Sequence, residues 1–161
     1  MINKENLYKE TQNMETPQEL IDLTIKNVEN ILKEAYPEYL TFGEGQFTLT
    51  HGSTQIMIIV RPFTNEETCI EVLANVVSDG NITPELMKFL LRKNAELHFG
   101  AFGLLFDDTI IFQHSIAGTN VDKNELITSI NAVSIIADHY DDELAIMSNG
   151  KRSIDLINEV N

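Results

Sequence analysis

The stretch from Thr83 to Gly118 constrains the fold most, because it places an amphipathic helix directly before a tight hairpin. The helical part reads TPELMKFLLRKNAEL, where Thr83 can cap the helix and Pro84 suits its first position. The next residues, FGAFGLLF and TIIFQHSI, alternate as two strands joined at Asp107-Asp108. A helix that leads at once into a hairpin favours an α+β fold in which this unit joins a sheet.

Three more strands are predicted before this unit, at residues 46–50, 54–61 and 68–77, separated by turns with Gly, Ser, Pro and Asn. A helix precedes them. It is predicted to start at Thr16-Pro17, with Glu19 completing a capping box, and to end at Pro37. The segment 38–44 reads as a connection to the first strand.

A long final helix is predicted after the hairpin. Asp122 and Glu125 form a capping box, and Asn149-Gly150 is a good stop signal. Apolar residues between these signals recur at alternating spacings of four and three. They are Leu126, Ile130, Val133, Ala137, Tyr140, Leu144 and Met147.

The predicted order is therefore α-β-β-β-α-β-β-α, with a five-stranded, mainly antiparallel sheet, since short links favour antiparallel pairing. We expect one domain over residues 16–147. Residues 1–15 are polar and read as a flexible tail. Residues 148–161 read as a second tail that can add a short helix.

Charge and composition exclude several classes of partner. The net charge of −14 repels phosphate backbones and anionic membranes, so neither nucleic acid nor a membrane is an expected partner. The longest apolar run, residues 56–60, is too short to span a bilayer, and the polar N-terminus is no secretory signal. The single cysteine, Cys69, cannot form an internal disulfide, which favours a cytoplasmic location.

The helix after Thr83 carries more apolar surface than one sheet face needs. Its apolar arc covers over half of the circumference, whereas packing on a sheet takes about a third. The excess predicts a second contact, either with the same helix of another subunit or with the N-terminal helix or a loop. For a homodimer interface the candidates are Met87, Leu91 and Ala95.

The sheet is also predicted to be apolar on both faces. If Ile70, Val72 and Ala74 face the helices, Leu73 points to the opposite side. An exposed apolar patch of this kind usually marks a surface that binds a partner. We therefore predict a peptide-binding patch on that face, composed of Met57, Ile59, Leu73, Leu105 and Ile111.

An alternative interpretation makes the chain a metal-binding protein or an enzyme. His139 stands among Asp138, Asp141, Asp142 and Glu143, although a solvated helix face explains this cluster more simply. Cys69 could act as a nucleophile with a histidine, but a cysteine in a strand is more often a small buried hydrophobe. We expect no catalytic residue, no metal and no cofactor.

The segment LLRKNAELHFGAFGLLFDDTIIFQHSIAGTNVDKNELITSINAVSIIADHYDDEL resembles the YbjN family. The shared features are a helix that ends in an Asn (Asn94), a hairpin running glycine-aromatic-apolar through an acidic turn, and a long last helix with an acidic end. The likeness covers about Thr16 to Met147. It implies the fold of type III secretion chaperones and a small, often dimeric, non-enzymatic protein that binds peptides or regulates by binding. The acidic surface also leaves open a regulatory adaptor.

Overall fold

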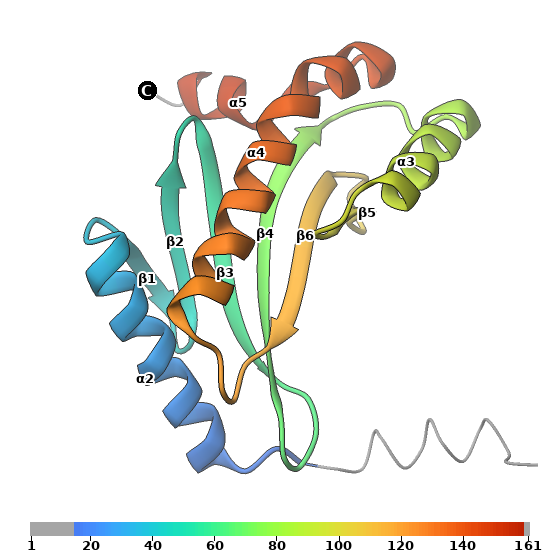
Figure 1. Cartoon of the computed structure of the whole chain (residues 1–161). Helices are drawn as coiled ribbons and strands as arrows, with labels where there is room; N and C mark the ends of the chain where they lie inside the picture. The colour runs from blue at the N-terminus through green and yellow to red at the C-terminus, as the bar shows by residue number, and fades with distance from the viewer. Residues whose placement is uncertain (1–14, 160–161) are drawn as a thin grey trace, which may run out of the picture.

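The computed structural model describes residues 15–159, and the predicted flexible tail falls almost wholly on residues outside this range. The described elements alternate helices and strands in one α+β unit (Figure 1). In chain order they are α2 (Gln18–Ala35), β1 (Leu40–Gly43), β2 (Gln46–His51), β3 (Thr54–Pro62), β4 (Thr68–Ser78), α3 (Pro84–Glu96), β5 (Ala101–Leu104), β6 (Ile110–Ala117), α4 (Lys123–Ser148), β7 (Lys151–Arg152) and α5 (Ser153–Glu159).

The strands form one sheet in the order β1-β2-β3-β4-β6-β5, and β7 pairs with the end of β4. Every pairing is antiparallel, as the short links predicted. The longest strand, β4, lies at the centre between β3 and β6. The α+β fold is confirmed, but the sheet has seven strands in the described residues, where five were expected.

The hydrophobic core lies between one face of the sheet and the helices α2 and α4, with α4 running diagonally across the sheet (Figure 1). Ile58, Val72 and Phe112 bury their side chains completely on this face. From α4, Leu126 and Ile130 are equally buried, as the alternating spacing predicted. Burying one such side chain contributes about 1.5–3 kcal/mol, so this layer is the main stabilising contact of the fold.

The connection predicted at residues 38–44 is wrong, because the segment contains strand β1. Leu40 pairs with Thr48 of β2, and a turn at Glu44-Gly45 closes the hairpin. Gly45 has φ +67°, and a Cβ there would lie 2.9 Å from Cδ1 of Ile25. Only glycine fits this turn without strain, so its presence permits a strand that is too short to show a clear periodicity.

The capping box predicted at Thr16 is also wrong. The N-cap of α2 is Pro17, and no side chain caps the helix. The Thr16 hydroxyl instead donates to the carbonyl of Thr64 at 2.7 Å and accepts the N–H of Phe63 at 2.8 Å. It satisfies two backbone groups of the β3–β4 loop and fastens the start of α2 to that loop.

The two other predicted helix starts are confirmed. The Thr83 hydroxyl accepts the N–H of Leu86 at 3.2 Å, and Pro84 is the first residue of α3. Asp122 and Glu125 form a complete capping box at the start of α4. These local signals succeeded because capping satisfies backbone N–H groups within one turn and needs no distant partner.

Candidate functional site

One face of the sheet is turned away from α2 and α4 (Figure 1). Along β3 and β4 the side chains alternate between buried and half-buried, and the half-buried ones share this second face. We call it the open sheet face and define it by Met57, Ile59 and Leu73. Met57 is the direct cross-strand partner of Leu73, while Ile59 stands opposite Glu71. These three predicted site residues therefore lie close together.

The other two predicted residues of this patch lie apart from these three. Ile111 shares the face and pairs with Asn75. Its side chain is only 4% exposed, so it offers little surface to a partner. Leu105 follows β5 in the turn before β6 and is 37% exposed. The structure thus forms the centre of the predicted patch on β3 and β4, with Leu105 at the far edge.

Sequence reasoning missed an apolar residue of the same face. Leu40 pairs with Thr48, and Thr48 pairs with Met57, so Leu40 extends the row across β1 and β2. Leu40 is 66% exposed, and Phe42, two residues further along β1, is exposed as well. The alternating triplet Leu40-Thr41-Phe42 was the available signal, but three residues are too few to distinguish a strand from a connection.

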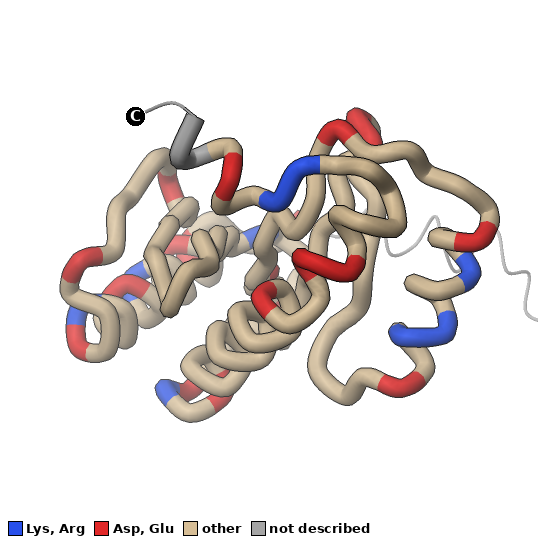
Figure 2. Tube along the Cα trace, turned by 90° about the horizontal axis from the view of Figure 1, so that it is seen from above, with Lys and Arg blue, Asp and Glu red and all other residues tan. Residues whose placement is uncertain are grey.

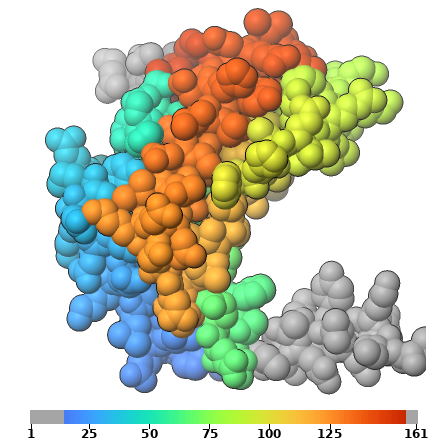
Figure 3. Space-filling model, in the orientation of Figure 1, coloured from blue at the N-terminus to red at the C-terminus, as the bar shows by residue number. Residues whose placement is uncertain are grey.

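The predicted dimer residues lie together on the outer face of α3. Met87, Leu91 and Ala95 follow each other at intervals of one helical turn, and all three are exposed, Leu91 by 69%. The opposite face buries Leu86 and Leu90. α2 lies at the far end of the sheet and does not cover α3, which projects from the body of the molecule (Figures 1 and 3).

The acidic cluster on α4 makes structural contacts. Ser53 donates a hydrogen bond to Asp138, and Arg152 of β7 pairs with Asp142 at 2.6 Å. The ring of His139 lies edge-on to Tyr140, 4.8 Å away. Within residues 15–159, no three His, Cys, Asp or Glu side chains come together as a metal site.

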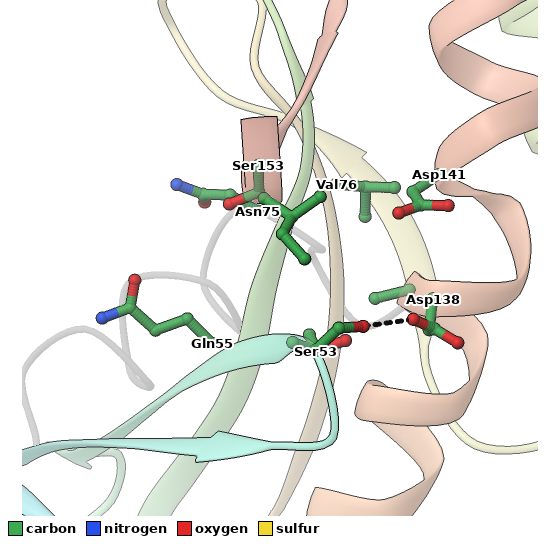
Figure 4. A pocket seen from close by; sticks show the side chains of 10 residues that line it. Ser53, Gln55, Asn75, Val76, Asp138, Asp141 and Ser153 are labelled. Atoms are coloured by element: carbon green, nitrogen blue, oxygen red, sulfur yellow. Dashed lines mark hydrogen bonds between the residues drawn. The ribbon is translucent and has the colours of Figure 1, made fainter. Parts of the chain in front are cut away.

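A cavity of about 20 Å³ beside this cluster has room for one water molecule (Figure 4). Ser53, Gln55, Asn75 and Asp141 are among the residues that line it. Among the residues that the structure describes, the buried side-chain oxygen of Asn75 has no hydrogen-bond partner, and a water molecule in this cavity would supply one. The cavity is too small for a substrate or a peptide side chain.

Cys69 lies on the open sheet face and is half-buried. Burial, followed by the nearby carboxylate of Glu71, raises the pKa of its thiol. A nucleophilic cysteine needs the opposite shift, since the thiolate is the reactive form. The environment of Cys69 therefore suits a packed thiol.

Acidic residues outnumber basic ones in the chain, 25 to 11, and Figure 2 shows where they lie along the backbone. Several cations are already paired with a carboxylate, including Arg61 with Glu71 and Lys123 with Glu34. The remaining acidic residues give the surface its negative charge, which favours positively charged partners and keeps exposed apolar patches in solution.

The model of the TY-Chap1 family, described as "T3SS (YopN, CesT) and YbjN peptide-binding chaperone 1", matches residues 18–156. The chain belongs to this family. The match spans every described element from α2 into α5, so it includes the open sheet face and the exposed face of α3. It confirms the resemblance to YbjN and to the type III secretion chaperones.

Several solved structures are similar to this chain in fold. The ExsC–ExsE complex matches with a TM-score of 0.59 and 14% identity, over 74% of this chain and 95% of the other. The HopA1–SchA chaperone–effector complex matches with 0.59 and 10%, over 75% and 95%. The Yersinia pestis secretion chaperone SycH, bound to a fragment of YscM2, matches with 0.52 and 15%, over 72% and 98%. At these identities the likeness concerns the fold.

No curated protein matches the sequence. Among the described residues, no helix has both the length and the hydropathy needed to cross a membrane.

Proposed function

We propose that this TY-Chap1 protein is a non-enzymatic, chaperone-like module that binds a peptide segment of another protein on its open sheet face. The pairing of Met57 with Leu73 at the centre of the sheet, on the face turned away from α2 and α4, carries the proposal. Ile59 and Leu40 extend this apolar surface toward the β1 edge. Family membership supports the class of function, and three of the structural neighbours contain a bound protein partner.

The apolar stripe formed by these residues suits one extended or amphipathic segment. Met57, Leu73 and Ile59 offer flat contact, while Glu71 and Gln113 border them with polar groups. Such a mixed surface resembles the apolar core and polar rim of protein interfaces. Leu105 lies at the margin of the proposed site, and the buried Ile111 shapes its floor.

We further propose that the protein is a homodimer through α3. Met87, Leu91 and Ala95 form a continuous exposed strip on a helix whose other face is buried. A twofold axis would place these strips against each other, as closed dimers require. Leu104, the last residue of β5, and Phe106, in the turn that follows, are also exposed. They add apolar surface beside α3, which contacts β5.

The proposal excludes a role for Cys69 or for the His139 cluster in chemistry. The thiol has a raised pKa, and of the carboxylates beside His139, Asp138 accepts a hydrogen bond from Ser53 and Asp142 pairs with Arg152. The lone cysteine fits a reducing cytoplasm, where we place the protein.

Fluorescence polarisation with a labelled amphipathic peptide of alternating Leu and Lys tests the open face. Leu73→Asp introduces a carboxylate at the centre of the face and should weaken binding about tenfold or more, because an apolar contact of about 1.4 kcal/mol or more is lost. Ile146→Asp is the matched control, since Ile146 is an exposed apolar residue of α4, away from the sheet. Equal losses in both variants, or none in either, would contradict the proposal.

The dimer is tested by light-scattering mass. Leu91→Glu should convert a dimer into a monomer, while Ile135→Glu on the exposed side of α4 should leave the mass unchanged. A monomeric wild-type protein at cellular concentrations would refute this part of the proposal and leave peptide binding untouched.

A further inference from the structure

The edge of the sheet beside α3 is closed along one half and open along the other. β5 pairs with β6 only from Ala101, opposite Gln113, to Leu104, opposite Ile110. β6 continues through residues 114–117, whose inner side pairs with β4. In the part of the chain that the structure describes, no strand lies on their outer side. We call these four residues the free β6 edge.

Asn94 protects the outer side of β5, which forms the closed half of this edge. Its side-chain amide donates to the carbonyl of Phe102 at 3.1 Å and accepts the N–H of Phe102 at 2.7 Å. These two bonds occupy the backbone groups of Phe102 that point away from β6. A further strand therefore cannot pair with β5 at Phe102 unless it displaces Asn94, which is one way in which proteins protect sheet edges.

The same two bonds show in which direction the backbone N–H and C=O groups of β6 point. Because Phe102 turns both groups away from β6, it forms a non-hydrogen-bonded pair with Phe112, and the odd-numbered residues of β6 bond toward β5. On the free β6 edge, the N–H and C=O groups of Ser115 and Ala117 then point outward. The N–H of Gly118 agrees with this alternation, since it donates to β4 at 2.9 Å.

The free β6 edge exists because the chain leaves the sheet at Gly100. Gly100 has φ +103°, and a Cβ there would lie 2.5 Å from the carbonyl oxygen of Gln113. The chain turns away from β6 at this point, and the ring of Phe99 packs edge-on against His114 at 5.8 Å. Figure 3 shows the result as a hollow between α3 and the β3–β4 loop, with β6 at its base.

The far end of the free β6 edge is acidic. The carboxylate of Glu67 accepts the N–H groups of Gly118 and Thr119, directly after β6, at 3.2 and 2.7 Å. The exposed Glu66 precedes it in the same loop. Arg61, the cation on the adjoining part of β3, already pairs with Glu71. A strand that lies along this edge would meet two carboxylates at one end and the exposed ring of Phe99 at the other.

We propose that the free β6 edge takes up an extended, basic segment of a partner protein as an added antiparallel strand. Up to four backbone hydrogen bonds form with Ser115 and Ala117, and lysine or arginine at the start of the segment meets Glu66 and Glu67. This site lies at the edge of the sheet and is separate from the open sheet face. Backbone bonds supply affinity in strand addition, and the flanking charges supply the choice of partner.

Charge favours a basic partner over a second copy of the chain. Each copy carries a net charge of −14, so pairing two such edges brings two strongly negative molecules together. A basic segment that binds instead neutralises part of this negative charge.

The experiment uses the full chain and the labelled peptide KKVTVTV, whose lysines would lie beside Glu66 and Glu67. Ala117→Pro removes one outward N–H and leaves the bonds to β4 in place, because these come from the even-numbered residues; proline is tolerated at such edge positions. Ala117→Ser keeps the N–H and is the matched control. Ser115→Pro repeats the test at a second position, and circular dichroism checks that each variant is folded.

We expect the wild type and Ala117→Ser to bind the peptide within about twofold of each other, and a proline variant to bind about tenfold more weakly, since a backbone bond and the strand geometry are lost. The peptide EEVTVTV should bind about tenfold more weakly than KKVTVTV at low salt.

Four results would overturn the proposal. These are no binding of KKVTVTV to the wild type, binding to both proline variants as tight as to the wild type, binding of EEVTVTV as tight as that of KKVTVTV, and a dimer that the proline variants dissociate, which would assign the edge to a second copy. Binding of KKVTVTV that is lost in Leu73→Asp but kept in Ala117→Pro would place the peptide on the open sheet face. That result would support the proposed function while rejecting the edge site.

Discussion

The side chain of Asn94 exchanges two hydrogen bonds with the backbone of Phe102, joining the last turn of α3 to the outer side of β5. The amide occupies the position that a neighbouring strand would take. It therefore holds α3 against the sheet and protects the edge strand from unwanted pairing.

Replacing Asn94 by alanine should destabilise the protein by about 1–3 kcal/mol, because two backbone groups lose their partners. Urea unfolding measures the change, and hydrogen exchange at the Phe102 N–H should become faster. Asn124→Ala, at an exposed position near the start of α4, is the control and should change stability little. A loss in Asn94→Ala no larger than in this control would show that the amide does not hold the edge.

Two adjacent isoleucines of β3 test which face of the sheet is the core. Ile58 is fully buried under the helices, whereas Ile59 lies on the open sheet face. Ile58→Ala should lower the free energy of unfolding by about 2–5 kcal/mol, and Ile59→Ala by about 1 kcal/mol. Denaturant titration of both variants compares them directly, and similar losses would mean that the second face is covered in solution.

His114 should make stability depend on pH. Burial lowers the pKa of its imidazole, and Nδ1 lies 3.1 Å from the Ser129 hydroxyl of α4. Because the folded pKa is below the unfolded value of about 6.5, the unfolded chain binds more protons between the two values. The free energy of unfolding should therefore fall as pH decreases below about 6.5, then level off below the folded pKa.

Thermal melts between neutral and mildly acidic pH follow this loss. His114→Gln should make the melting temperature depend less on pH in that window. At higher pH the variant and the wild type should show the same dependence. An unchanged slope in His114→Gln would assign the dependence to other groups.

Cys69 should react slowly with alkylating reagents. Burial and the carboxylate of Glu71 raise the pKa of its thiol, so less thiolate is present near neutral pH. The rate with iodoacetamide should lie below that of the same chain unfolded in urea and rise as pH is increased. A native rate above the unfolded rate would revive the hypothesis of a nucleophilic cysteine.

Local signals in the sequence predicted most of the fold. The cap at Thr83, the capping box of Asp122 with Glu125 and the spacing along α4 depend on neighbours within a few residues. β1 escaped detection because it has four residues, and β7 because its two residues become a strand only by pairing with the distant Val77 and Ser78. Thr16 misled because its hydroxyl has partners in the β3–β4 loop.

The candidate site was predictable in part for the same physical reason. Alternation along β4 placed Leu73 opposite the core, and the pairing with Met57 followed from the short link between β3 and β4. The burial of Ile111 and the bonds of Asn94 to Phe102 depend on contacts between elements, which periodicity does not report. The free β6 edge was hidden because no local signal shows that β5 begins only at Ala101.

Methyl NMR of the full chain during titration with the Leu/Lys peptide tests the central claim most directly, because it reports on each apolar side chain separately. We predict that the methyl signals of Met57, Ile59 and Leu73 shift together and saturably, while those of Ile58 and Val72 on the core side change little. Shifts confined to Met87 and Leu91 on α3, or no shift on the open sheet face at saturation, would contradict the account.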